Sequence, residues 1–403
     1  MMNPLSDEMR RNPYPLYDQM RGTSPVLHLE GPDLWMIFDY EGVRRALTDH
    51  ESFSSSMATA NRRNPPWLFF FDPPRHTKLR ALVMRAFTPR VIANVEPRIR
   101  ELSRELLDQR IEDGEMDLAA DFSIPLPMIV IAEMLGIPAA DRPRFRRWSD
   151  GILKLSYTVS GGEGSEEASN EFKAVTAETD DYLAGLLEER RTAPSDDLLT
   201  RLIAAEVDGE RLAHEEILGF FQLLLVAGTE TTTNLINNAF LCFTENPGEL
   251  ARLRANPDLL PSAIEEVLRY RSPVQWMLRA TNRAVELHGQ VIPAGKLVLP
   301  VIGSANRDPR EFADPDRFDV TRDPNPHIAF GHGIHFCLGA ALSRLEARIA
   351  LSDLLERLRD FSRASEEPWE PRKALHVHGP ARLPIRFAPA ARPNSSEAGI
   401  ETV

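Results

Sequence analysis

The sequence is poor in cysteine: its 403 residues contain only Cys242 and Cys337. Two cysteines cannot form the disulfide framework of a small secreted domain, so the composition points to a reducing compartment, and we expect a cytoplasmic protein. Cys242 lies within a long apolar segment, where a free cysteine packs as a small hydrophobic residue. Cys337 is therefore the cysteine left for chemistry.

Long hydrophobic runs and a surplus of positive charge are also missing. The apolar run Leu223–Ala227, with Phe220 and Phe221 before it, falls well short of the ~20 residues that span a bilayer. The first residues, Met1–Glu8, contain no apolar run of the kind found in a signal peptide. With 47 basic and 60 acidic residues the net charge is −13, which disfavours nucleic acid as a partner. We therefore expect neither a membrane anchor nor a nucleic-acid site.

Hydrophobic residues make up 42% of the chain, enough for a large core. Helical periodicity dominates, and a hairpin of two short apolar segments around Gly31 and Pro32 indicates some sheet. The sequence thus predicts a mainly α protein with small β-sheets. The segments expected to be helical include Pro97–Gly114, Pro127–Leu135, Asp141–Lys154, Phe172–Arg191 and Glu215–Thr244.

The most unusual stretch is Phe330–Gly339 (FGHGIHFCLG), which contains Cys337 and three glycines. Glycine lets the backbone adopt positive φ angles or lets another group approach closely. An amphipathic segment, Ala340–Leu351, follows directly and predicts a helix. Cys337 then lies just before a helix N-terminus, where free N–H groups and the helix dipole favour a thiolate.

A thiolate in this position could be a nucleophile, a zinc ligand or an iron ligand. His327, His332 and His335 lie nearby in sequence, although structural zinc sites usually have two well-separated pairs of ligands. A small core residue in a tight turn is a further alternative. The residues alone leave these alternatives open.

Two other segments carry candidate functional residues. Ala227–Thr232 (AGTETT) places glycine and β-branched hydroxyls in the middle of the predicted helix Glu215–Thr244, which is poor helix chemistry and therefore a place to expect function. His76 and Arg80 share one face of a helix after Asp72-Pro73-Pro74, where they could clamp a carboxylate. An ordinary solvated helix face is the alternative for this second pair.

The pattern Phe-Gly-x-Gly-x-His-x-Cys-x-Gly resembles the haem-binding loop of the cytochrome P450 superfamily. AGTETT, Glu266-x-x-Arg269 and Asp314-Pro-Asp-Arg-Phe318 resemble further motifs of that family, and they occur in the family's order. The resemblance implies that Cys337 is the proximal thiolate ligand of the haem iron. It also implies that Phe330 packs beside the sulfur, that Gly331 and Gly333 let the loop fold under the porphyrin, and that Gly339 lets the next helix come close.

The resemblance implies roles for the other motifs as well. Ala227 and Gly228 would leave space for O2, and Glu230 with Thr231 would be the acid–alcohol pair that delivers protons. The donors to the haem propionates would be His76, Arg80, Arg279 and His335. A buried structural network would consist of Glu266, Arg269 and Arg317, and the loss of one partner would strand a buried charge.

The implied protein is a cytochrome P450 fold over residues 1–388, a single domain of about a dozen helices around haem b, followed by a disordered tail, 389–403. It would use O2 and NAD(P)H to hydroxylate or epoxidise a small apolar substrate. Because the chain has no flavin or ferredoxin module, electrons would come through a separate ferredoxin and ferredoxin reductase. We expect a monomer. The expected substrate contacts are the loop Ser52–Phe70, a lid at Leu155–Glu167, Leu224–Thr231 and Val274–Leu278.

Two alternatives remain at this point. Some members of the family are driven by peroxide or isomerise peroxides, but these tend to lack the acid–alcohol pair that Glu230 and Thr231 would form. A non-enzymatic zinc- or haem-binding protein is the other alternative, and metal analysis would separate it from an iron enzyme.

Overall fold

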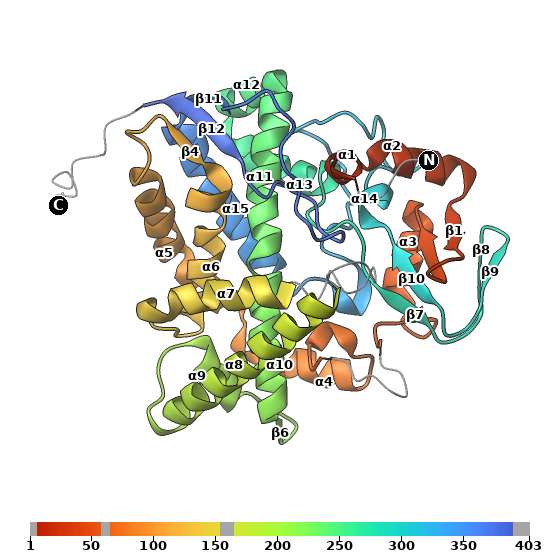
Figure 1. Ribbon diagram of the computed structural model, residues 1–403, viewed down its shortest axis with the longest axis vertical. Coiled ribbons are helices and arrows are strands. Elements are labelled where there is room, and N and C mark those ends of the chain that lie inside the picture. Colours follow the sequence, from red (N-terminus) through yellow and green to blue (C-terminus); the bar gives the residue numbers. More distant parts are fainter. Residues whose placement is uncertain (1–5, 58–64, 154–164, 390–403) are drawn as a thin grey trace.

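The computed structural model describes residues 6–57, 65–153 and 165–389. A helical body lies on one side, and most of the sheet lies on the other (Figure 1). The mainly helical prediction is confirmed. The helices are α1 (Asp7–Arg11), α2 (Tyr14–Thr23), α3 (Tyr40–Thr48), α4 (Arg75–Ala86), α5 (Pro89–Asp108), α6 (Pro125–Met134), α7 (Arg142–Leu153), α8 (Ser165–Thr192), α9 (Leu198–Ala204), α10 (His214–Ala227), α11 (Glu230–Glu245), α12 (Pro247–Ala255), α13 (Leu260–Tyr270), α14 (Ile302–Ala305) and α15 (Ala340–Arg357).

The strands form one five-stranded sheet and smaller pieces. The larger sheet has the order β1-β2-β10-β7-β3, with β2 and β10 parallel and the other pairs antiparallel. A three-stranded sheet has the order β11-β12-β4, and β5-β6 and β8-β9 are hairpins. The strands are β1 (Val26–Leu29), β2 (Leu34–Ile37), β3 (Phe53–Ser54), β4 (Glu115–Asp117), β5 (Glu206–Val207), β6 (Glu210–Arg211), β7 (Arg279–Thr281), β8 (Val285–Leu287), β9 (Gln290–Ile292), β10 (Leu297–Pro300), β11 (Arg359–Arg363) and β12 (Pro384–Ala388).

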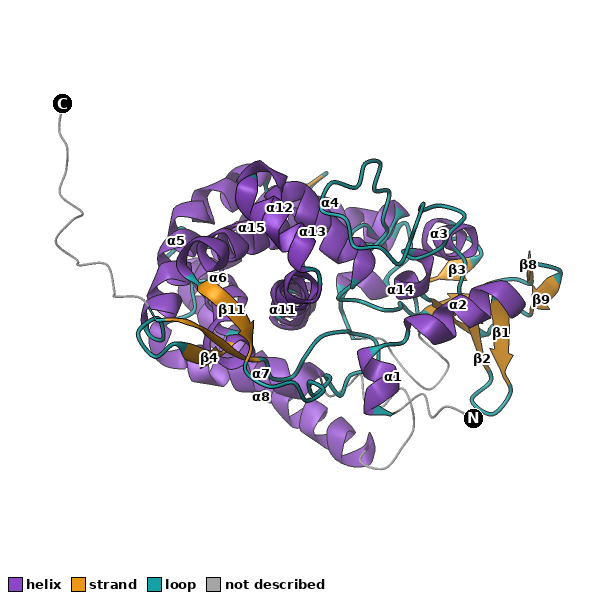
Figure 2. Ribbon diagram, turned by 90° about the horizontal axis from the view of Figure 1, so that it is seen from above, coloured by secondary structure: helices purple, strands orange, loops and turns teal. Residues whose placement is uncertain are grey.

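Helix α11 runs through the middle of the molecule and is seen end-on, surrounded by other elements, in Figure 2. Every residue from Thr232 to Phe243 is buried. The sequence predicted one helix over Glu215–Thr244, but the structure has two, α10 and α11, which meet end to end at Gly228 and Thr229 (Figure 1). At the junction the Thr229 hydroxyl donates to the Leu225 carbonyl (2.7 Å), a side-chain bond that competes with the regular helical ladder.

Helix α5 begins earlier than the sequence predicted. The expected helix Pro97–Gly114 is the second part of α5, which starts at Pro89 and ends at Asp108. Thr88 caps it by accepting a hydrogen bond from the Val91 N–H (3.3 Å). Proline at the first helical position costs no hydrogen bond, and Pro97 is tolerated within the long helix.

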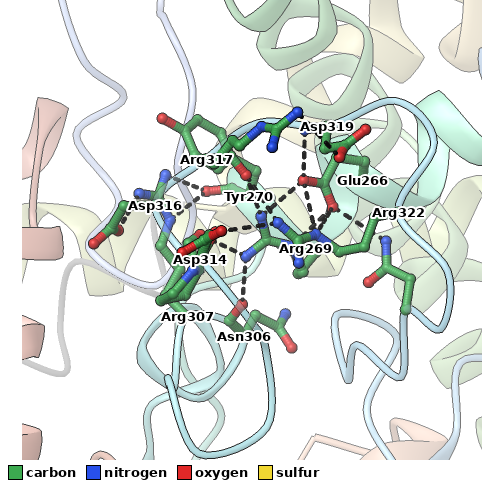
Figure 3. A network of polar contacts seen from close by, with 12 residues as sticks. Glu266, Arg269, Tyr270, Asn306, Arg307, Asp314, Asp316, Arg317, Asp319 and Arg322 are labelled. Carbon is green, nitrogen blue, oxygen red and sulfur yellow. Dashed lines mark hydrogen bonds and ion pairs between the residues drawn. The ribbon is translucent and has the colours of Figure 1, made fainter.

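A buried ionic network fixes the loops that precede Cys337 (Figure 3). The Glu266 carboxylate accepts two hydrogen bonds from Arg269 (2.8 Å each), and both side chains are fully buried. The second arginine is Arg322, whose Nε lies 3.1 Å from Glu266 Oε2. The prediction of Arg317 as the partner of Glu266 is wrong. Its side chain is 61% exposed and pairs with Asp319 (3.6 Å), and its contact with Arg269 and Arg322 is made by its carbonyl, which accepts from both. The resemblance implied Arg317, the first arginine after Pro315, but it is Arg322 that faces the carboxylate.

Three predicted segments fall wholly or partly outside the described residues. These are the tail 389–403 beyond residue 389, most of the lid Leu155–Glu167, and residues 58–64 of the loop Ser52–Phe70. None of the helices in the described part of the chain combines the length and apolar character needed to cross a membrane.

Candidate haem-thiolate site

The Cys337 loop is held in shape by its backbone. Gly331 and Gly333 have φ angles of +75° and +69°, which side chains rarely adopt, so glycine is required at both positions. The Cys337 N–H donates to the Phe330 carbonyl (2.9 Å), which closes the loop before α15 begins. Gly339 has neither a positive φ nor a crowded site, because an added Cβ would lie 3.9 Å from the Cys337 sulfur. The backbone at Gly339 therefore gives no reason for the close approach of the next helix that the resemblance implied.

The Cys337 thiol is enclosed by protein on most sides but keeps an exposed face, whereas Cys242 is buried in the core. Burial raises the pKa of the Cys337 thiol, while the N–H groups of Gly339 and Ala340 and the Arg80 side chain lower it. Burial prevails, so the helix N-terminus alone does not ionise this sulfur. A coordinated metal cation would deprotonate it outright.

The candidate ligands of a zinc site do not come together in the described part of the chain. No group of three His, Cys, Asp or Glu side chains among residues 6–57, 65–153 and 165–389 is arranged to hold a metal ion. His327 is instead paired with Glu265 (2.9 Å), and His335 lies 2.9 Å from the Ser55 hydroxyl.

The four residues predicted to bind carboxylates come together from three parts of the chain. His76 and Arg80 lie on α4, Arg279 begins β7, and His335 lies in the Cys337 loop. The rings of His76 and His335 are 4.2 Å apart between centroids. Arg80 donates to the Phe336 carbonyl (2.9 Å), and Arg279 donates to the Leu278 carbonyl (2.8 Å). We call His76, Arg80, Arg279 and His335 the cationic cluster.

The cationic cluster lacks a matching negative charge within the described protein. Neither ring nitrogen of buried His76 has a hydrogen-bond partner there, and the guanidiniums of Arg80 and Arg279 make bonds only to carbonyls. Burial lowers the pKa of Arg279 to about 10, and burial followed by the Arg80 charge lowers the pKa of His76 to about 4. Burial and then Arg279 lower the pKa of His335 to about 3.

These observations test whether the residues fit a haem. Arg80 and Arg279 carry the positive charge of the cluster, while pKa values of about 4 and 3 leave His76 and His335 as neutral hydrogen-bonding rings. Because a buried cation is stable when an anion pairs with it, the cluster suits a ligand that brings carboxylates to this place. The Asp72 carboxylate raises the pKa of Arg279 and of His76, but it forms no ion pair with them and is instead bonded to Ser54 and Ser55. A thiol with an exposed face and an unpaired cationic cluster beside it are what a haem with two propionates requires, so the site fits.

The junction of α10 and α11 has an open face. Ala227 is exposed although it lies between the buried segments of α10 and α11. The Thr231 hydroxyl donates to the Ala227 carbonyl (2.7 Å), which fixes it on the same side. Gly228 points elsewhere, because an added Cβ would meet Ile131 of α6 at 3.1 Å. Its missing side chain therefore allows α6 to pack against the junction.

Glu230 is a buried acid with an unusual proton affinity. Glu230 is 8% exposed, and in the described part of the chain its carboxyl makes no hydrogen bond or ion pair. Burial raises the pKa of Glu230 to about 7, partly offset by Arg372, while Asp150 raises it further. A carboxyl of this kind can hold and release a proton near neutral pH.

The aromatic part of the predicted substrate loop is anchored to α10. The Trp67 indole donates to Gln222 (3.0 Å), and the Pro66 carbonyl lies where a Cβ on Gly219 would be, at 2.0 Å. Trp67 is therefore a structural anchor of this loop.

Sequence reasoning missed Glu346, a fully buried acid on α15. It contacts α11 through Thr232, whose hydroxyl also bonds to Ser343 (3.1 Å). Burial raises the pKa of Glu346 to about 8. A signal was present, because Glu346 lies between Leu342 and Ile349 on the apolar face of the predicted helix.

Glu346 gives a prediction on stability. The folded protein holds a proton on this carboxyl that the unfolded chain releases above its ordinary pKa of 4.5. The stability that this carboxyl contributes is thus fully present below pH 4.5. The free energy of unfolding then falls by up to ~1.4 kcal/mol per pH unit as the pH rises toward about 8. We expect Glu346→Gln to flatten this decline, measured by urea unfolding across the range. Glu356→Gln, an exposed position on the same helix, is the control, and an equal effect of both would contradict the prediction.

Comparisons with known proteins agree with this geometry. The family model described as "Cytochrome P450" matches residues 6–378. The Vitamin D(3) 25-hydroxylase of Pseudonocardia autotrophica is 38% identical over 392 residues, covering 94% of both chains. Cytochrome P450 CYP109Q5 from Chondromyces apiculatus superposes with a TM-score of 0.88 at 41% identity, over 97% of this chain and 99% of that one. CYP109E1 from Bacillus megaterium, in complex with testosterone, has a TM-score of 0.85 at 41% identity, over 93% and 99%.

Proposed function

Because the chain belongs to the cytochrome P450 family and is a haem-dependent monooxygenase, we propose that it hydroxylates or epoxidises a small apolar molecule. One oxygen atom of O2 enters a C–H or C=C bond of the substrate, and the other leaves as water. The observation that carries the proposal is the Cys337 thiol with an exposed face beside the unpaired cationic cluster.

In this proposal the residues of the site divide into ligands and proton carriers. Cys337 is the thiolate ligand of the iron, flanked by Phe330 in the same loop, and the four residues of the cationic cluster hold the propionates. Haem b, when bound, supplies the activation of O2. Ala227 keeps the open side of the junction of α10 and α11 free of a bulky side chain, and Gly228 lets α6 pack against the junction. Glu230 stores a proton in a buried position, and the Thr231 hydroxyl orients the water that carries it.

The electrons reach the site from outside the chain in this proposal. A ferredoxin reductase takes them from NAD(P)H, and a ferredoxin carries them to this protein, which acts as a single chain in the cytoplasm. Support comes from the two cysteines, one buried and one a candidate ligand, which leave none for a disulfide or an iron–sulfur cluster.

The relatives suggest which apolar molecules to try. CYP109E1 has been crystallised with testosterone, and another relative carries vitamin D3 in its name. We therefore propose steroids and related polycyclic molecules as the first candidates among apolar substrates. The test is a low-to-high spin shift of the purified protein when each candidate is added, followed by product analysis under 18O2 with ferredoxin, its reductase and NADPH.

The same experiment separates the alternatives. One labelled oxygen atom in the product, with turnover that depends on ferredoxin, is the expected result. Product formed only with added peroxide, with no incorporation from 18O2, would overturn the monooxygenase cycle with separate electron donors.

A second prediction concerns the proton carriers. We expect Glu230→Gln and Thr231→Ala to lower the product formed per NAD(P)H roughly tenfold, with peroxide released instead, because proton transfer by positioned groups contributes at least ~10²-fold to rates. Thr233→Ala is the matched control, since this hydroxyl faces away and bonds to the Ser123 carbonyl (2.8 Å). Coupling that is unimpaired in both site variants would contradict these roles.

A further inference from the structure

Helix α11 carries a row of buried amides that the core does not satisfy. Asn234, Asn237 and Asn238 are all 0% exposed. Neither the amide nitrogen nor the oxygen of Asn234 has a hydrogen-bond partner among the described residues, and the same holds for Nδ2 of Asn237 and Oδ1 of Asn238. An unpaired buried polar group costs ~1–3 kcal/mol, so apolar side chains would be more stable here unless these amides have a use.

Two of the amides are in line with Glu230. Residues four apart lie on one face of a helix, so Glu230, Asn234 and Asn238 form a continuous stripe. The segment around His378 covers this stripe. A Cβ added to Gly379 would lie 2.4 Å from Asn234 Oδ1, and the Asn238 amide donates to the His378 carbonyl (2.9 Å). In Figure 1 this C-terminal segment, drawn in dark blue, descends beside α11.

The stripe continues outward through His378. This residue is 2% exposed; its Nε2 lies 3.1 Å from the Arg11 carbonyl, and its Nδ1 has no partner in the described protein. The ring of Tyr14 is 5.8 Å away, and its buried hydroxyl is also unpaired there. Tyr14 then lines a cavity of about 460 Å³ with Arg11, Arg271, Arg307 and Trp369.

We propose that Asn234, Asn238, His378 and Tyr14 line a hydrated track that carries protons from this cavity to Glu230. The proposal rests on the proton-carrying role proposed above for Glu230. Buried water occupies polar sites that offer two to four partners, and the unpaired atoms of these four residues offer such partners in succession. A proton enters from solvent water in the cavity, passes between waters held by the track, and ends on the Glu230 carboxylate. The four side chains are positioning residues, and none is consumed.

The first test looks for the water directly. A high-resolution crystal structure of the resting holoenzyme is expected to show ordered waters within hydrogen-bonding distance of the Asn234 amide and of Asn238 Oδ1 or His378 Nδ1. Direct protein partners for these atoms, with no water between Glu230 and Tyr14, would overturn the proposal.

The second test compares two equal substitutions. Asn234→Leu keeps the shape of the side chain but removes its polar atoms from the track. Asn237→Leu makes the same change off the stripe, at a residue that is equally buried and whose Nδ2 is also unpaired, but whose Oδ1 accepts from the Ser123 hydroxyl (2.8 Å). We expect Asn234→Leu to lower product per NAD(P)H at least roughly threefold and to raise the solvent isotope effect, while Asn237→Leu leaves both near wild type. An equal amount of product per NAD(P)H in the two variants would overturn the proposed track.

Two further variants keep the result interpretable. Tyr14→Phe removes only a hydroxyl and is expected to shift coupling in the same direction as Asn234→Leu but less, even if the latter folds poorly. If Glu230→Gln uncouples the enzyme and the track variants do not, the track fails and the role of Glu230 stands. If Glu230→Gln has no effect, the role proposed for Glu230 fails, and the track fails with it.

Discussion

Replacing Cys337 with serine is expected to leave the protein folded but to abolish its monooxygenase activity. Serine occupies nearly the same space, and the loop is shaped by Gly331, Gly333 and the bond from the residue 337 N–H to Phe330. A hydroxyl at this position is a far weaker ligand and supplies no thiolate charge to the iron. The measurement is the Soret band of the reduced CO complex, which should lose the red shift that a thiolate ligand causes.

Cys242 provides the control for this experiment. It is fully buried in the core on α11, and burial raises its pKa to about 12, so it stays a neutral thiol. Cys242→Ser should cost stability but leave the red-shifted band intact. A red-shifted band that survives Cys337→Ser would refute the assignment of the ligand.

The second large effect is expected in the buried network of Figure 3, where Glu266→Gln should destabilise the protein by roughly 3–5 kcal/mol. The substitution leaves Arg269, which is 0% exposed, without its carboxylate. Because small domains are stable by only ~5–15 kcal/mol, a loss of this size should sharply reduce the yield of folded holoenzyme. The midpoint of urea unfolding, followed by far-UV circular dichroism, measures it.

The two arginines of the following loop make this prediction specific. Arg322→Ala removes a side chain that is 11% exposed and bonded to Glu266, so we expect a loss of several kcal/mol. Arg317→Ala removes a side chain that is 61% exposed, and we expect a change below ~1 kcal/mol. The opposite order of effects would restore the sequence-based assignment of Arg317 to the network.

Features carried by neighbouring residues could be predicted without the structure. The Cys337 loop is one continuous stretch, and its glycines are required by the local backbone at residues 331 and 333. The helices that bury their faces against the core were also predictable, because a period of 3.6 residues is written along the chain. Their ends were less certain: the start of α5 depended on Thr88, a cap outside the predicted periodic segment.

Features that depend on where distant residues meet could not be predicted in the same way. Arg322, and not Arg317, reaches Glu266 because the intervening loop turns back on α13. The pKa of Glu230 near 7 follows from burial at the junction of α10 and α11, which no spacing reveals. The unpaired amide of Asn234 becomes notable only when Gly379 is seen to cover it.

The sequence by itself therefore indicated the family, through motifs that are continuous in the chain, and the mainly helical fold, through its periodicity, and it pointed to Cys337 as the proposed ligand. Only the tertiary structure decided which arginine completes the buried network, how two arginines and two histidines from three parts of the chain converge, and which polar groups remain unpaired. The physical reason is that burial and charge pairing depend on distances in space, and folding sets those distances between residues far apart in the chain.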